Sequence, residues 1–218
     1  MRFLLEALDP STECPRYTSV VDISEEDVAE VAAMIDATPA DLLDGAQFDL
    51  TTEEVRRLDA RFGLQLDARS IPVRLRRAAA VDELPYPAHT GRELDLMLRG
   101  TKPLACFTGR YPVNPDVEEI PERLFDPYVA AGKFAKRECV VPLDCPVTDH
   151  HGPVRGTRMV LYALPHQRWR IEAMLYLLDA GAKSGWSEGM ERLQGMLLGY
   201  ENWQNDIFIE RLFRKRSQ

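Results

Sequence analysis

The chain has 218 residues, of which 45% are hydrophobic and 28% are charged, and its formal net charge is −8 at pH 7. This composition is ordinary for a globular protein with one good core. The negative charge argues against general nucleic-acid binding, which needs basic side chains that neutralise phosphates. No apolar run approaches the ~20 residues of a membrane-spanning helix, so no membrane partner is expected.

The beginning of the chain, MRFLLEALDP, lacks the long apolar segment of a secretory signal, so the expected location is the cytoplasm. The four cysteines form no CxxC pair. In a cytoplasmic protein such cysteines are expected to be free thiols rather than a disulfide framework.

The first third of the chain is predicted to be irregular over 1–20, with a strand over 18–23. Acidic residues after Ser24 favour a helix start there, because the helix dipole stabilises negative charge at that end. A helical turn is predicted over 40–43. A further helix is expected to begin at Thr51 and to end at Gly63, which can adopt a left-handed conformation.

Residues 22–59 contain many more Asp and Glu residues than basic ones, which are only Arg56 and Arg57. The usual explanation is a solvated outer face, and the sharper one is a docking surface for a basic partner. Next comes a predicted strand over 70–77, in which apolar and polar residues alternate. The arginines in and beside it either pair with the acidic helices or form an anion site; they are Arg69, Arg74, Arg76 and Arg77.

The stretch 85–112 is the densest in local signals. Thr90 and Glu93 have the spacing of a capping box, which predicts a helix that starts at Thr90 and stops at Gly100. A short apolar strand is expected over 104–107. The functional interpretation assigns His89 and Glu93 to general acid–base catalysis.

In that interpretation Arg92, Arg110 and Tyr111 bind an anionic ligand near the helix start. The alternative interpretation is structural. It makes Glu93 a helix cap, Arg92 a solvated residue and His89 a hydrogen-bonded loop residue. The sequence is compatible with both interpretations.

The following part is predicted to contain a helix from Pro121 to Gly132, a strand over 134–141 and a long loop over 142–156. Four potential metal ligands lie in or just before this loop: Cys139, Cys145, His150 and His151. Their spacing matches no strong metal-binding pattern, so no metal is assigned. No cofactor is identified either.

The last third is predicted to contain a core strand over 157–164 and then helices over 166–180, 187–198 and 201–213. Together the elements predict an α+β fold with a mixed or mostly antiparallel sheet of about five or six strands, helices packed on it and a helical C-terminal third. The chain is expected to form a single domain, 1–218, in which 1–80 is a semi-separate acidic layer.

The sequence contains no GxGxxG, Walker A, HExxH or GxSxG motif, so whether the protein is an enzyme is left undecided. The leading hypothesis is a cytoplasmic interaction protein, of immunity or regulatory type, whose acidic surface binds a basic protein partner. The alternative is a small enzyme that acts on a small anionic ligand around His89, Arg92, Glu93 and Arg110. Association with further copies of the chain is compatible with either hypothesis.

Overall fold

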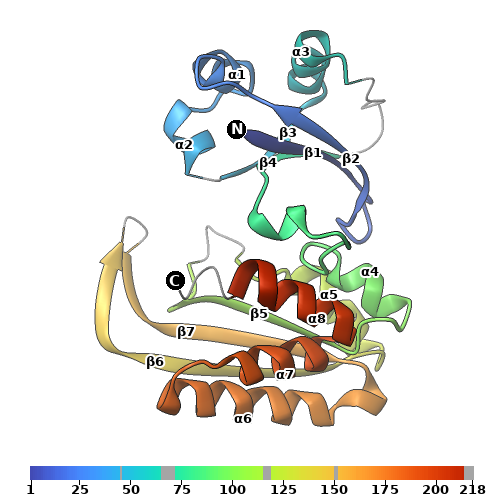
Figure 1. The fold of residues 1–218 in the computed structure, drawn as a ribbon, viewed down its shortest axis with the longest axis vertical. Helices are drawn as coiled ribbons and strands as arrows, with labels where there is room; N and C mark the ends of the chain where they lie inside the picture. The colour runs from blue at the N-terminus through green and yellow to red at the C-terminus, as the bar shows by residue number, and fades with distance from the viewer. Residues whose placement is uncertain (45, 65–71, 115–118, 150–151, 214–218) are drawn as a thin grey trace. The chain divides into compact units, whose positions relative to one another are not determined.

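The computed structural model describes residues 1–44, 46–64, 72–114, 119–149 and 152–213. The chain divides into two compact units, Met1–Arg92 and Glu93–Gln218, each with a sheet and a core of its own. Helices and antiparallel strand pairs in both units confirm the predicted α+β class (Figure 1). The described strands form two sheets, of four and three strands, where the sequence predicted one. None of the described helices is long and apolar enough to cross a membrane.

The sheet of the first unit has the order β2-β1-β4-β3. Its strands are β1 (Arg2–Leu8), β2 (Pro15–Asp22), β3 (Gln47–Leu50) and β4 (Val73–Arg77). β1 pairs with both β2 and β4, so it is an inner strand. The prediction that residues 1–20 are irregular was therefore wrong. β1 is buried at every residue after Arg2, and a strand covered on both faces lacks the alternation that reveals a half-buried one.

Three helices cover one face of this sheet (Figure 1). They are α1 (Val28–Met34), α2 (Pro39–Leu43) and α3 (Thr52–Phe62). The helix predicted to begin at Thr51 is present as α3, and a capping box starts it: the Thr51 hydroxyl accepts a hydrogen bond from the Glu54 N–H, and the Glu54 carboxylate accepts one from the Thr51 N–H. Beneath the helices, alternate strand residues such as Leu5 and Leu75 form the core.

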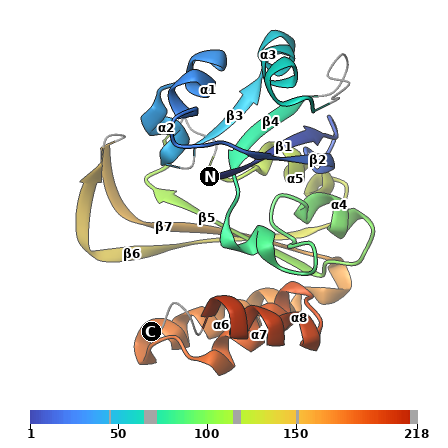
Figure 2. The same ribbon diagram turned by 45° about the horizontal axis from the view of Figure 1, so that its top comes forward.

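The sheet of the second unit has the order β5-β7-β6, formed by β5 (Leu104–Tyr111), β6 (Ala135–Asp149) and β7 (Gly152–Ala163). One face packs against α4 (Glu93–Leu98) and α5 (Glu122–Ala130). The other packs against α6 (Trp169–Ser184) and α7 (Glu188–Leu198), which follow the short 3-10 turn η2 (Pro165–Gln167) (Figure 2). The chain continues through α8 (Asn202–Phe208) and a π-helical turn, η3 (Ile209–Phe213), so the helical C-terminal third is confirmed.

Two local predictions in the second unit were wrong. The predicted loop over 142–156 is the end of a hairpin, in which β6 and β7 pair from Val147 with Val154 to Asp149 with Gly152. Helix α4 begins at Glu93, so Thr90 lies three residues before it and is not its cap. The intervening residues form a turn, in which the Arg92 N–H donates to the His89 carbonyl oxygen at 2.9 Å and Gly91 has φ +74°.

A close approach between α7 and α8 leads to a first prediction. A Cβ atom at Gly195 would lie 1.9 Å from the Asn205 Oδ1 atom, and Asn205 is buried. The Gly195→Ala variant is therefore expected to lose about 1–3 kcal/mol of stability in urea denaturation, as overpacked cores do. Gly189→Ala, in the first turn of the same helix, is the matched control. Its nearest neighbour would be 3.8 Å away, so it should gain about 0.4–1 kcal/mol. Equal effects at both positions would contradict the prediction.

Candidate functional site

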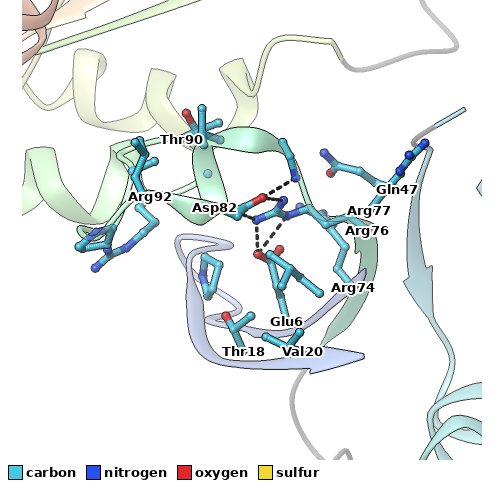
Figure 3. Close-up of a pocket in the computed structure, with 18 of the residues that line it drawn as sticks. Glu6, Thr18, Val20, Gln47, Arg74, Arg76, Arg77, Asp82, Thr90 and Arg92 are labelled. Atoms are coloured by element: carbon cyan, nitrogen blue, oxygen red, sulfur yellow. Dashed lines mark hydrogen bonds and ion pairs between the residues drawn. The ribbon is translucent and has the colours of Figure 1, made fainter. Parts of the chain in front are cut away.

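The face of the first sheet opposite helices α1 to α3 contributes to a cavity of about 950 Å³. Strand residues that point away from the helical core line one side of it, among them Glu6, Thr18 and Arg76 (Figure 3). The segment after β4 lines the other side, through the 3-10 turn η1 (Ala80–Glu83) and on to Arg92. All the lining residues belong to the first unit.

Three charged side chains form a hydrogen-bonded triad in the wall of this cavity: Glu6, Arg76 and Asp82 (Figure 3). Arg76 donates to Glu6 Oε1 through Nε and Nη2, at 3.0 and 2.9 Å. Through Nη1 and Nη2 it also donates to both oxygens of Asp82, at 2.8 and 2.9 Å. Two carboxylates and one guanidinium leave the triad with a net charge of about −1. Glu6 is only 6% exposed, so this charge is largely shielded from water.

The contacts within the triad keep Arg76 and Asp82 ionised. Hydrogen bonds to Asp82 and then to Glu6 raise the pKa of Arg76, although burial opposes this. Burial alone would raise the pKa of Asp82, but hydrogen bonds from Arg76 and from the Ala79 N–H outweigh it and lower that pKa. An ionised Asp82 carboxylate therefore lies in the cavity wall at neutral pH.

The other arginines of the wall differ in how they are paired. Arg74 donates to Asp49 Oδ1 at 2.8 Å, and Arg77 donates to the Leu43 carbonyl oxygen at 2.7 Å. Arg92 has no carboxylate partner in the part of the chain that the structure describes. In Figure 3 Arg92 lies on one side of the triad, and Arg74 and Arg77 lie on the other.

The residues predicted for the site fall into both units. Arg92 lines the cavity, and His89 lies between two lining residues, Ala88 and Thr90. Glu93, Arg110 and Tyr111 belong to the second unit. The catalytic pairing of His89 with Glu93 stays a prediction.

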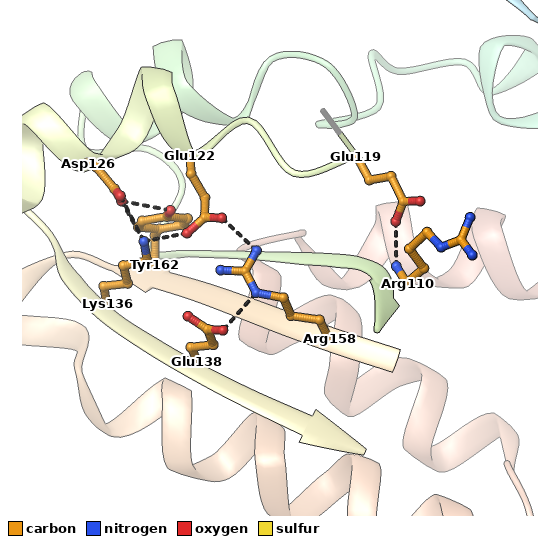
Figure 4. Close-up of polar contacts among 8 residues, drawn as sticks. All are labelled: Arg110, Glu119, Glu122, Asp126, Lys136, Glu138, Arg158 and Tyr162. Atoms are coloured by element: carbon orange, nitrogen blue, oxygen red, sulfur yellow. Dashed lines mark hydrogen bonds and ion pairs between the residues drawn. The ribbon is translucent and has the colours of Figure 1, made fainter. Parts of the chain in front are cut away.

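Arg110 lies on β5, and its guanidinium donates to the carbonyl oxygens of Gly152 and Pro153, at 3.0 and 3.4 Å. Its backbone N–H donates to the Glu119 carboxylate (Figure 4). Tyr111 follows it at the end of β5 and is exposed. The two neighbours share the end of one edge strand, and their proposed role toward a ligand stays a prediction.

The second unit contains its own cluster of charges on β6, β7 and α5 (Figure 4). Glu122 accepts from Lys136 at 2.6 Å and from Arg158 at 2.6 Å. Arg158 also binds Glu138 at 2.7 Å. The hydrogen bond from Arg158 is the main cause that lowers the pKa of Glu122 to about 2. Each of these two cations is held by two carboxylates, so the cluster is best explained as a structural link between α5 and the sheet.

The described residues contain no group of three or more His, Cys, Asp or Glu side chains arranged to hold a metal ion. Two of the candidates from the sequence, His150 and His151, lie outside the described residues. Cys139 packs at the edge of the core under α6 and α7, and Cys145 is exposed.

The acidic residues around α1 and α2 are mostly at the surface. The side chains of several of them have neither a cation partner nor a hydrogen bond within the described residues, namely those of Glu25, Glu26, Asp36 and Asp44. Others are paired locally, as Asp22 is with Arg2 and Glu30 with Arg61. The negative surface is therefore only partly neutralised.

Comparisons with protein-family models, with curated proteins and with solved structures found no match for this chain. The cavity in the first unit is the candidate ligand site of the described residues. Sequence reasoning identified Arg92 and Arg76 but missed Glu6 and Asp82. The available signal for Glu6 was an acidic residue inside the apolar run RFLLEAL, since a buried carboxylate needs a partner.

Proposed function

We propose that the protein binds a small anionic molecule in the cavity of its first unit. The observation that carries the proposal is Arg92, a cation in the cavity wall with no carboxylate partner in the described residues. A guanidinium offers a planar fork of donors that matches carboxylate or phosphate oxygens. The volume of about 950 Å³ falls within the range of small-molecule sites.

The proposal has an enzymatic form, in which His89 is the general acid or base and Glu93 assists it. His89 neighbours lining residues on both sides along the chain, which is the support for this form. An enzyme would lose turnover in the His89→Ala variant while it still bound the anion. If the His89→Ala variant lost both anion binding and turnover, His89 would have a role in binding the anion only.

The binding proposal is tested by a two-dimensional NMR titration with pentanoate and, separately, with inorganic phosphate. At least one of the two anions is expected to shift amide signals of lining residues such as Thr18, Gln47 and Gly91. Arg92→Gln should weaken that binding by about tenfold or more, because a hydrogen bond between charged groups is lost. The control is Arg2→Gln, which changes an exposed arginine outside the cavity. Absence of shifts with both anions would overturn the proposal.

A second candidate function is the binding of a basic protein partner, as in an immunity or regulatory protein of the cytoplasm. The observation that favours it is the set of exposed acidic side chains without cation partners in the described residues, which includes Glu25 and Glu26. Such a surface attracts a positively charged partner and speeds its association.

The test compares cross-linked partners of the wild-type protein with those of a Glu25→Lys/Glu26→Lys variant at moderate salt. A partner that depends on this surface should be lost from the variant and should bind less as salt is raised. Identical partner sets for both proteins would exclude this surface as the docking site.

A further inference from the structure

A second charged group in the cavity wall, the Glu6 carboxylate, is also suited to bind a ligand. Glu6 is 6% exposed and lines the cavity, and both of its contacts with Arg76 use the single oxygen Oε1. The other oxygen, Oε2, accepts no hydrogen bond from a described residue. A carboxylate oxygen of a nearly buried side chain is costly to leave without a donor.

The rest of the triad does not supply that donor. Arg76 uses Nε, Nη1 and Nη2 on Glu6 and Asp82. Since the triad bears a net charge of about −1, it repels an anionic group of a ligand and attracts a cationic one. The ligand group that fits at Glu6 is therefore a hydrogen-bond donor, and best of all a protonated amine.

Two parts of the cavity wall thus favour opposite charges. Arg92 offers a cation on one side, and the Glu6–Arg76–Asp82 triad offers a negative centre away from it (Figure 3). The cavity also has apolar lining residues, which include Leu4, Val20 and Leu84 and suit a hydrocarbon segment.

From this juxtaposition we infer that the ligand is a small zwitterion, with its anionic group at Arg92 and its ammonium group at Glu6 Oε2. The inference rests on the proposed anion-binding function and narrows its ligand class to amino acids or similar amino-carboxylates. A single ligand would then satisfy both groups, which neither a simple anion nor a simple amine does.

The experiment uses straight-chain ω-amino acids from three to eight carbons, each compared with the carboxylate and the amine of the same length. NMR titration of the full chain gives an affinity for every compound. One chain length is expected to bind best, and at that length the amino acid should bind about tenfold tighter or more than the carboxylate that lacks the amine.

Two variants separate the two ends of the ligand. Arg92→Gln should remove the contribution of the carboxylate and leave the affinity for the matching amine as it was. Glu6→Gln should remove the contribution of the ammonium group and leave the affinity for the matching carboxylate as it was. The amide keeps the size of the side chain but removes the charge that holds an ammonium group. The NMR spectrum of each variant shows whether it is folded. Should Glu6→Gln unfold, Asp82→Asn replaces it, since it lowers the negative charge of the same triad.

The outcomes distinguish the two proposals. Equal affinities for the amino acid and its carboxylate in the wild-type protein would overturn the zwitterion inference while anion binding at Arg92 still stood. Binding of the amines alone would overturn both proposals, as would no binding of any compound.

Discussion

Replacement of Arg76 by methionine is expected to lower the free energy of unfolding by about 3–5 kcal/mol. The reason is that, among the described residues, Arg76 alone holds the Glu6 carboxylate, which is 6% exposed, and it also binds both oxygens of Asp82. Removing the guanidinium leaves a buried negative charge without compensation, beside a second carboxylate of like sign. Such a loss exceeds that of a neutral hydrogen bond several times over.

Urea denaturation at pH 7 measures this effect. The matched control is Arg2→Met in the neighbouring strand, because the ion pair of Arg2 with Asp22 has side chains that are 56% and 69% exposed. An exposed pair should cost less than about 1 kcal/mol. The Glu6→Met/Arg76→Met double variant should recover part of the loss, since the buried charge is removed together with its partner. If Arg76→Met cost no more than Arg2→Met, the triad would not be the buried ion network described above.

Much of the fold could be predicted from the sequence because its signals are local. The capping box at Thr51 and Glu54 lies within four residues, and the helix that it predicts is present as α3. The hairpin of β6 and β7 was hidden because prolines and glycines over 142–156 usually indicate a loop. β6 is an edge strand, where proline is tolerated, and its pairing shifts register between Pro142 and Val147.

In the candidate site, local sequence signals revealed Arg92 but not the pairing of Glu6 with Arg76. Arg92 could be singled out because its neighbours Thr90 and Glu93 indicated a helix start, where an anion can bind. The pairing of Glu6 with Arg76 spans 70 positions of the chain, and only the register of β1 beside β4 brings them together. No pattern within a short stretch of sequence specifies that register. The acidic residues of the site, Glu6 and Asp82, could therefore be identified only from the structure.

The buried side chain of Lys102 is expected to make the free energy of unfolding depend strongly on pH. This lysine is 2% exposed, its Nζ donates to the Leu198 carbonyl oxygen at 3.4 Å, and it lies 5.6 Å from the centroid of the Tyr200 ring. Burial lowers its pKa from 10.5 to about 8, although the negative charge of Glu93 opposes the shift. Between these two pH values the unfolded chain binds a proton that the folded chain has released.

Because the unfolded state binds more protons in this window, the contribution of Lys102 to the free energy of unfolding rises with pH. It should increase by on the order of 3 kcal/mol between about pH 8 and pH 10.5, at about 1.4 kcal/mol for each pKa unit. Cys106 acts in the opposite direction at higher pH. Burial raises its pKa from 9.0 to about 11, so the folded state there holds the extra proton and stability falls.

The two effects are separated by measuring the difference in unfolding free energy between the wild-type protein and a Lys102→Met variant from pH 7 to pH 10.5. Cys106 is present in both proteins and largely cancels, so the difference should move in favour of the wild type as the pH rises past 8. Lys183→Met, which removes an exposed lysine of α6, should give a difference that hardly changes with pH. A constant difference for Lys102→Met would mean that Lys102 titrates like a solvated lysine, and that water reaches a side chain placed here in the protein interior.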